Sequence, residues 1–247
     1  LKHTHHPEME PACRAILVRL LTWRAKHIRF NPALAKSCRE DLLALQQRKR
    51  HDHCRRMPDQ EVALTGLSIN CLTTHSGEVK KAACKLALNN IMQVQSSDLR
   101  AKPGMERACE EDIRRLCPDV EPGKGRLHQC LRERVAKIKS SACRDMVGAV
   151  WKAEKKDAVL NPGVRVDCQN ELSAFCPDVE RGEGRNLVCL YQHEKLQGFG
   201  QACKDAMRRV SPNVTIPAVA KAMQELLAKR NFWDTWGGVT IGGIVVL

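Results

Sequence analysis

Cysteine is the residue type in this chain whose number and spacing could support chemistry. Thirteen cysteines occur among 247 residues, whereas aromatic residues make up only 4%. Cysteines can form disulfides, bind zinc as thiolates, or exchange electrons in a redox site. Because large aromatic side chains are too few to build much of a core, we expect disulfides to stabilise the fold. That use of cysteine predicts an oxidising compartment.

The cysteine spacing repeats along the chain. Two sets of four, beginning at Cys109 and Cys168, both follow Cys-x7-Cys-x12-Cys, with the fourth cysteine after x12 or x13. A third set, beginning at Cys38, follows Cys-x15-Cys-x16-Cys-x12-Cys. The interval from the last cysteine of one set to the first of the next is constant. Such a fixed period predicts tandem repeats, which serve binding more often than catalysis.

Zinc binding and redox catalysis fit this spacing poorly. The sequence has no C-x-x-C pair, and the longer intervals between its cysteines do not bring zinc ligands together locally. A thiol redox site would also need a paired-cysteine motif. We therefore predict that the protein has no bound metal and no cofactor.

Cys13 stands outside the three sets. It precedes Cys38 by the same interval that separates Cys84 from Cys109 and Cys143 from Cys168. We therefore interpret Cys13 as the last cysteine of an upstream repeat, in a chain that begins inside a longer protein. A free or intermolecular thiol is the alternative.

The residues between the cysteines predict short amphipathic helices. In residues 109–117, two cysteines, an isoleucine and a leucine fall on one helical face, and Pro118 then ends the helix. The same pattern fills residues 168–176, before Pro177. A second and a third apolar stripe of helical period follow in each set. The predicted fold class is all-α, with tandem disulfide-stapled helical-hairpin or three-helix repeats forming an elongated array.

Antiparallel packing of three consecutive helices favours one of the three possible disulfide connectivities in each set. The end of the first helix lies beside the start of the second, which pairs the second cysteine with the third. The third helix returns to the start of the first, which pairs the first cysteine with the fourth. The predicted bonds are Cys109–Cys143, Cys117–Cys130, Cys168–Cys203, Cys176–Cys189, Cys38–Cys84 and Cys54–Cys71.

The loop after the first helix is nearly the same in the two regular sets. Pro-Asp-Val-Glu-x-Gly-x-Gly-Arg occupies residues 118–126 and 177–185. Its repetition favours a structural role for Arg126 and Arg185, in a buried ion pair with an acidic residue of the same loop, over contact with a ligand. Acidic residues in the first turn of the first helix, Asp112 among them, suit the helix dipole and need no catalytic role.

The set from Cys38 departs from this rule. Its first interval is twice as long as in the regular sets, and the excess equals about two helical turns, so we expect a longer first helix. Its loop keeps Pro58 and Asp59 but lacks Gly-x-Gly-Arg. With these sets, the predicted organisation is an upstream remnant and connector at 1–37, a degenerate repeat at 38–108, regular repeats at 109–167 and 168–230, and the start of a membrane helix at 231–247.

The pattern Cys-x7-Cys-Pro-Asp-Val-Glu-x-Gly-x-Gly-Arg-x3-Cys-Leu, with a fourth cysteine further on, resembles a known family. It is similar to the cysteine-rich repeat of the Golgi apparatus protein 1 family, also described as cysteine-rich fibroblast growth factor receptors and E-selectin ligands. The match is close at 109–143 and 168–203 and weaker at 38–84. With the connectors, it covers nearly all of the chain before residue 231.

The resemblance implies a single-pass type I membrane glycoprotein of the Golgi, with its repeats in the lumen. It implies fibroblast growth factors and E-selectin as protein partners, and no catalytic residues, so we expect no enzyme activity. The uncharged apolar run at 236–247 fits the first half of a membrane helix, and a buried strand or a tail is the alternative. Asn213 begins the chain's N-glycosylation sequon, which agrees with a lumenal position.

A basic segment spans residues 48–56, within a chain of net charge +13. It could bind sulfated or sialylated glycans, although the solvated face of a helix explains it more simply. We do not expect a nucleic-acid partner, because a membrane-tethered, disulfide-rich chain does not meet one and no binding motif is present. The candidate ligand-binding residues are Arg48, Lys49, Arg50, Arg55 and Arg56.

Binding of secreted or surface glycoproteins is therefore the predicted function. A structural spacer next to the membrane is the first alternative. A saposin-like lipid-binding module is the second, but it would need sets of six cysteines and a larger apolar inner face.

Overall fold

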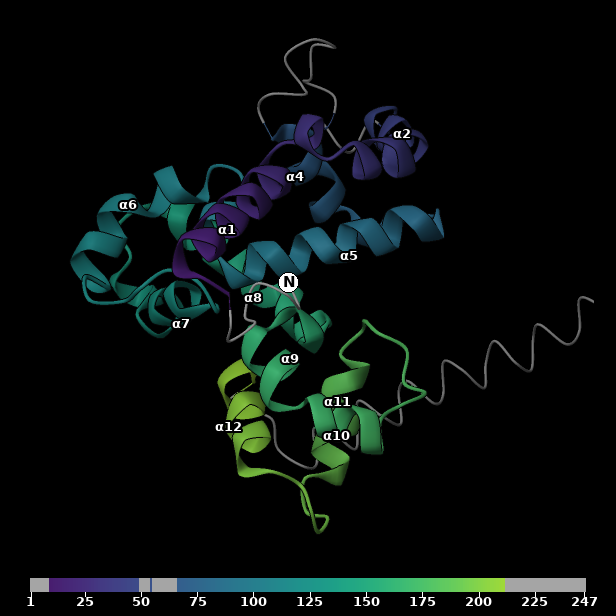
Figure 1. The fold of residues 1–247 in the computed structure, drawn as a ribbon, viewed down its shortest axis with the longest axis vertical. Coiled ribbons are helices and arrows are strands. Elements are labelled where there is room, and N and C mark those ends of the chain that lie inside the picture. Colours follow the sequence, from purple (N-terminus) through teal and green to yellow (C-terminus); the bar gives the residue numbers. More distant parts are fainter. Residues whose placement is uncertain (1–8, 49–53, 55–65, 212–247) are drawn as a thin grey trace, which may run out of the picture. The chain divides into compact units, whose positions relative to one another are not determined.

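The described part of the chain is helical throughout. The computed structural model describes residues 9–48, Cys54 and 66–211, and every regular element within them is an α-helix or a short 3-10 helix (Figure 1). The predicted all-α class with disulfide-stapled helical repeats is therefore confirmed. The elements are α1 (Pro11–Lys26), η1 (Ile28–Phe30), α2 (Pro32–Gln46), α4 (Leu67–Thr74), η2 (Ser76–Glu78), α5 (Ala82–Ser97), η3 (Leu99–Ala101), α6 (Met105–Leu116), α7 (Arg126–Glu133), η4 (Val135–Lys137), α8 (Ser141–Lys156), η5 (Ala158–Leu160), α9 (Pro162–Asp167), α10 (Gln169–Phe175), α11 (Arg185–His193) and α12 (Gln201–Val210).

The connector between cysteine sets has one structure that occurs three times. A long helix of 16 residues, α1, α5 or α8, is followed after one residue by a 3-10 turn. The next helix then starts near a proline, at Pro32, Pro103 or Pro162. Pro32 and Pro162 are the first residues of their helices, where the fixed φ of proline fits and its missing N–H costs no hydrogen bond, whereas Pro103 stands two residues before α6.

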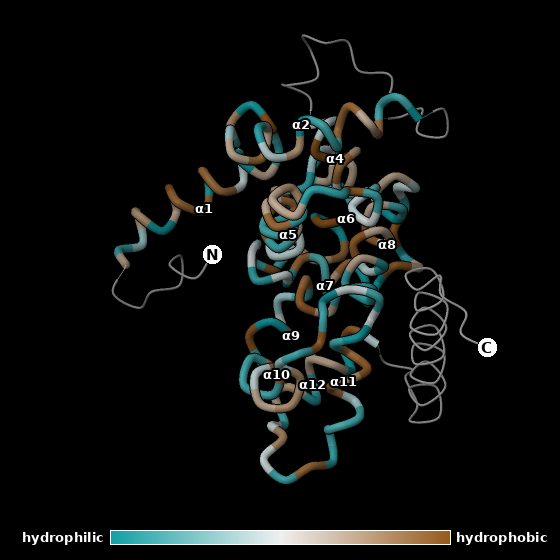
Figure 2. The backbone as a smooth tube through the Cα atoms, turned by 90° about the vertical axis from the view of Figure 1, so that its right-hand side faces the viewer, coloured by the Kyte–Doolittle hydropathy of each residue, from teal (hydrophilic) through white to brown (hydrophobic). Residues whose placement is uncertain are grey.

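Each cysteine set lies in its own apolar core. One core surrounds Cys38 and Cys84 and includes Leu34, Ile69 and Leu88. The other two cores each combine four half-cystines with apolar residues of the surrounding helices. Figure 2 shows apolar and polar residues interspersed along the helices, as expected for helices with one face in a core. Disulfides therefore occupy the centre of each core, as expected for a chain with few aromatic residues.

The chain divides into two compact units. The first comprises Leu1–Glu154 with Val159–Gly163, and the second Lys155–Ala158 with Val164–Leu247. The first unit contains two of the cores, and the second contains the core around Cys168.

The prediction of a longer first helix in the Cys38 set is wrong. Helix α2 ends at Gln46, eight residues after Cys38, and α6 ends seven residues after Cys109. The two helices thus end at nearly the same point of the repeat. The residues that lengthen this set fall instead in the segments on either side of Cys54, which lie outside the described residues.

Two predicted membrane and lumenal features also lie outside the described residues. These are the membrane helix expected to begin at 231–247 and the sequon at Asn213. Among the helices that are described, none combines the length and apolar character needed to cross a membrane.

Candidate functional site

Six disulfides form the most regular feature of the structure. They join Cys38–Cys84, Cys54–Cys71, Cys109–Cys143, Cys117–Cys130, Cys168–Cys203 and Cys176–Cys189. In each set the first cysteine pairs with the fourth and the second with the third, as antiparallel packing predicts. The first–fourth bonds hold the closest helices, with Cα atoms 4.6 to 4.8 Å apart.

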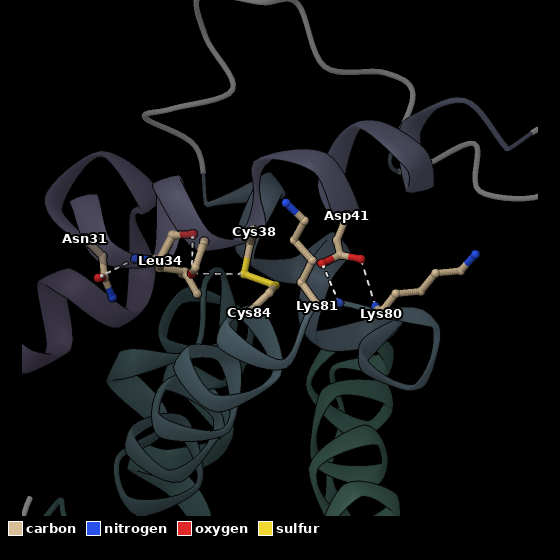
Figure 3. The surroundings of a disulfide bond; sticks show 8 residues. Asn31, Leu34, Cys38, Asp41, Lys80, Lys81 and Cys84 are labelled. Atoms are coloured by element: carbon tan, nitrogen blue, oxygen red, sulfur yellow. Dashed lines mark hydrogen bonds between the residues drawn. A yellow bond between two sulfur atoms is a disulfide. The ribbon is translucent and has the colours of Figure 1, made fainter.

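A buried carboxylate accompanies each first–fourth disulfide. Asp41 lies on α2 one turn after Cys38, and its two oxygens accept hydrogen bonds from the backbone N–H groups of Lys80 and Lys81, at 2.8 and 3.3 Å (Figure 3). These amides precede α5 and have no partner within that helix. The carboxylate therefore caps α5, next to the disulfide that joins α5 to α2.

The same contact recurs in the other two sets. Asp112, three residues after Cys109, accepts from the N–H groups of Lys139 and Ser140 at 2.9 and 3.0 Å. Glu171, three residues after Cys168, accepts from the N–H of Gly200 at 2.9 Å. The repeat thus contains a Cys-x2-Asp/Glu element on the helix with the first cysteine of the set, here called the first-cysteine helix. Its cysteine and its carboxylate both bind the helix with the fourth cysteine, here called the fourth-cysteine helix.

Asp112 stays ionised despite its position in the protein interior. It is 2% exposed, and burial alone would raise the pKa of its carboxyl group. The two backbone hydrogen bonds and the guanidinium of Arg115, 2.6 Å away, outweigh burial and lower that pKa below the ordinary value of 3.8. The charge of Asp112 therefore stabilises the fold at neutral pH.

The second glycine of each repeated loop rests on the end of the preceding long helix. The N–H of Gly125 donates to the carbonyl of Ser97 at 2.8 Å, and that of Gly184 to Lys156 at 2.7 Å. Both glycines have a positive φ, +73° and +74°, a conformation that favours glycine. These contacts end the long helix by satisfying one of its last free carbonyls.

The Cys38 set keeps this glycine, although its sequence had suggested that the motif was lost. Gly66 lies five residues before Cys71, as Gly125 lies before Cys130, and it has φ +72°. A Cβ at Gly66 would lie 2.7 Å from the carbonyl oxygen of Lys26, which ends α1. The glycines of the three sets are evenly spaced along the chain, so the period of the array holds in the degenerate set too.

The loop arginines form the predicted ion pairs, but at the surface. Arg126 lies 3.0 Å from Glu121 and Arg185 lies 3.4 Å from Glu180, while the two glutamates are 80% and 86% exposed. The expectation of burial is wrong, because the loop faces solvent and its glycines, not its arginines, contact the long helix. Exposed pairs of this kind contribute little to stability.

His128 is a buried histidine that sequence reasoning did not single out. Its Nε2 donates to the carbonyl of Gln95 across 3.0 Å, and Gln95 in turn donates from its side chain to the carbonyl of Ala25. Burial lowers the pKa of His128 to about 4, and the positive charge of Lys102 acts in the same direction. Its Nδ1 atom is buried without a hydrogen-bond partner, so the neutral ring fits this position and the charged ring does not.

The candidate basic segment is described only in part. Arg48 ends the described stretch and forms an ion pair with Glu78 of η2. Lys49, Arg50, Arg55 and Arg56 lie outside the described residues. The structure therefore places one of the five candidate ligand-binding residues, and it places that one against an acidic side chain of its own repeat.

One group in the described part of the chain has the spacing of metal ligands. Cys176, Cys189 and His193 bring two sulfurs and a ring nitrogen within 4.8 Å of one another. The two sulfurs are bonded to each other, so neither can act as a thiolate ligand. The group does not fit a zinc ion while the disulfide is intact.

The comparisons with known proteins agree with the repeat seen in the structure. The model of the family described as "Cysteine rich repeat" matches residues 11–80, 82–139 and 141–196. The three matched segments begin where α1, α5 and α8 begin. No solved structure matches the chain.

Among curated proteins, the chain is similar to several called Golgi apparatus protein 1. It is 26% identical to that of Gallus gallus over 197 residues, which are 78% of this chain and 17% of the chicken protein. It is 25% identical to that of Homo sapiens, over 78% of this chain and 16% of the human protein. A Golgi apparatus protein 1 homolog of Caenorhabditis elegans is 21% identical over 79% of this chain and 18% of the worm protein.

The matched region thus spans about a sixth of the length of these relatives. The family model matches most of the residues before 197. The Cys-x2-Asp/Glu elements and the glycine contacts recur with it, so the chain contains one kind of repeat three times. The chain belongs to the Cysteine rich repeat family.

Proposed function

We propose that this chain is a lumenal segment of a Golgi membrane glycoprotein that binds and retains secreted or surface glycoproteins. The observation that carries the proposal is the family match, with relatives whose name is Golgi apparatus protein 1. Six disulfides support the lumenal position, because such bonds persist in the secretory pathway and are rare in the cytosol.

The repeated contacts of the structure support binding rather than catalysis. The carboxylates and glycines that recur in each repeat bind backbone groups of the same array. No lysine or arginine in the described part of the chain is among the buried residues. Repeat proteins commonly use such exteriors as extended binding surfaces. A net charge of +13 favours partners that carry acidic glycans or acidic protein segments.

Fibroblast growth factors and E-selectin are the protein partners that the family resemblance suggests. Because those growth factors are basic, charge attraction to this basic chain would not favour them directly. Sulfated or sialylated glycans on a bound glycoprotein fit the charge of this chain better.

A binding experiment separates this proposal from a structural spacer. The oxidised chain, secreted from cells, is immobilised and titrated with a fibroblast growth factor, with E-selectin and with heparin. We expect saturable binding of at least one of them, with an affinity that falls as salt rises. Absence of saturable binding to all three would favour the spacer.

Two variants of equal charge change test whether the basic segment is the binding surface. In the first, Lys49, Arg50, Arg55 and Arg56 are replaced by glutamate. In the control, four exposed basic residues of the 109–167 repeat are replaced by glutamate: Arg114, Lys124, Lys139 and Lys152. We expect the first variant to lose heparin retention while the control keeps most of it, and equal losses would remove the case for a special basic site.

A further inference from the structure

Helix α1 carries an exposed apolar face that no described part of the chain covers. Ile16, Leu20 and Trp23 are 60%, 55% and 48% exposed, and Phe30 of η1 is 43% exposed. Cys13, one turn before Ile16, is exposed and is the one unpaired cysteine among the described residues. We call these five residues the open face. Figure 2 shows that the first turns of α1 project away from α2, α4 and α5.

The apolar positions four and seven residues after the fourth cysteine are buried in every complete repeat. Four residues after Cys84, Cys143 and Cys203 comes an apolar residue that is 1%, 3% or 0% exposed, and three residues later a second one that is 6%, 8% or 0% exposed. In α1 the corresponding residues are Leu17, which is only half-buried, and Leu20. The sequence of α1 thus has the apolar pattern of a fourth-cysteine helix, but its side chains lack the cover that the other three have.

In the complete repeats the helix that carries the first cysteine is joined to the helix that carries the fourth. The first-cysteine helix supplies the half-cystine that bonds the fourth cysteine, as Cys38 bonds Cys84 (Figure 3). It also supplies a carboxylate that accepts from the amides three and four residues before the fourth cysteine. The equivalent amides before Cys13 belong to Met9 and Glu10.

The aromatic end of the open face corresponds to a contact between neighbouring repeats. Ala101 and Leu160 occupy the place of Phe30 in the next two connectors, and they are 0% and 3% exposed. The carbonyl of Leu160 accepts a hydrogen bond from Ser96, at the end of the preceding long helix α5. The 3-10 turn therefore packs against the long helix one repeat earlier, and η1 has no such helix among the described residues.

We propose that the open face is a repeat–repeat interface, occupied by a cysteine-rich repeat from outside residues 1–247. The first helix of that repeat carries Cys-x2-Asp or Cys-x2-Glu. Its cysteine forms a disulfide with Cys13, and its carboxylate accepts from the N–H groups of Met9 and Glu10. The two thiols lose two protons and two electrons to a disulfide-bearing oxidoreductase as the bond forms.

A second copy of this chain cannot supply the occupant. Its first cysteines, Cys38, Cys109 and Cys168, are already bonded within their own repeats. Its remaining cysteine is another Cys13, whose helix is of the fourth-cysteine kind and carries the same uncovered side chains. The matched region is only 17% of the chicken relative, which leaves room for the occupant in a protein of that length.

Disulfide mapping of the protein purified from the cells that make it tests the proposal. The protein is alkylated in denaturant without reduction, digested, and analysed by mass spectrometry. We expect the Cys13 peptide to be joined to a peptide that contains Cys-x2-Asp or Cys-x2-Glu and lies outside residues 1–247. An alkylated Cys13, a Cys13–Cys13 bond, a glutathione adduct, or a partner peptide without the acidic residue would each overturn it.

A pair of variants tests the apolar part of the interface. Ile16→Glu with Leu20→Glu places two charges in the open face, and the control Leu86→Glu changes a residue of α5 that is 67% exposed. We expect alkylated Cys13 to be absent from the unchanged protein and to make up more than about half of the molecules in the double variant, because carboxylates resist burial. The control should leave it unchanged. The Cys38–Cys84 cross-link in the same digest shows that the neighbouring repeat has folded, and an unchanged Cys13 cross-link in the double variant would contradict the proposal.

Discussion

Asp112 is held between two backbone amides and the guanidinium of Arg115, in the core of its repeat. We expect Asp112→Asn to lower the free energy of unfolding by about 2 kcal/mol, because an amide cannot accept all the hydrogen bonds that a buried carboxylate accepts. The measurement is thermal or denaturant unfolding of the oxidised protein. Glu110→Gln is the matched control, since Glu110 lies on the same helix, is 66% exposed, and should change stability little.

The contribution of Asp112 should also depend on pH in a known direction. Its pKa is lowered in the fold, so its charge stabilises the protein fully above the ordinary value of 3.8 and less as the pH falls through the lower folded value. The stability difference between the wild type and Asp112→Asn should therefore be constant near neutral pH and shrink below 3.8. A difference that persists unchanged under strongly acid conditions would show that the carboxylate charge is not what matters.

His128 predicts a second loss of stability on acidification, in mildly acid solution. Its pKa falls from 6.5 to about 4 in the fold, so between these values the unfolded chain binds a proton that the folded chain excludes. Wild-type stability should fall by roughly 3 kcal/mol as the pH drops through this window. His128→Gln keeps a donor for the carbonyl of Gln95 and should show a smaller fall. Equal pH profiles of the two proteins would contradict this role.

At this scale the sequence showed which residues were charged but not which were buried. Asp112 follows two other acidic residues, which the sequence placed in the first turn of a helix, where the helix dipole is a sufficient reason for negative charge. Helix α6 begins at Met105 instead, so this reason does not apply to Asp112. Its burial depends on Lys139 and Ser140, which lie two helices further along the chain, and no local pattern reveals that contact. A signal was available nonetheless, because an acidic residue stands three positions after the first cysteine in all three sets.

At the scale of elements, the second glycine of each repeated loop fixes where the helix that follows it, α7 or α11, meets the preceding long helix, α5 or α8. Gly125 and Gly123 both have positive φ, but only at Gly125 would a Cβ meet a neighbour, Pro162 at 2.9 Å. We expect Gly123→Ala to cost about 1 kcal/mol through backbone strain alone, and Gly125→Ala to cost about 2 to 4 kcal/mol. Thermal unfolding of the two variants measures the difference, and equal losses would show that the close approach of Gly125 to Pro162 is unimportant.

The disulfide connectivity was predictable from the sequence because it depends on the order of helices and the shortness of their loops. The length of α2 was not, since the spacing from Cys38 to Cys54 does not say whether extra residues extend a helix or a loop. The glycine of the Cys38 set was missed for the same reason. Gly66 stands at the right distance from Cys71, but the altered spacing upstream concealed the match.

At the scale of the whole molecule, the cores suggest that stability is local. Each of the three cysteine sets has its own buried apolar cluster, and the chain divides into two compact units with the Cys168 core in the second. In repeat proteins, stability is a sum of repeat terms and nearest-neighbour terms. Loss of one disulfide should therefore affect its own repeat first.

The double variant Cys168→Ser with Cys203→Ser tests this locality. The bond joins cysteines at a sequence separation of 35, so its loss should lower the free energy of unfolding of this repeat by about 4 kcal/mol. The core that loses the bond also includes Val164 and Met207. Hydrogen exchange should then accelerate in α10, α11 and α12, while the amides of α2 and α5 keep their protection. The reciprocal variant, Cys38→Ser with Cys84→Ser, should reverse the pattern. If either variant lost protection evenly along the whole chain, the repeats would unfold as one cooperative body, and the additive account of their stability would be wrong.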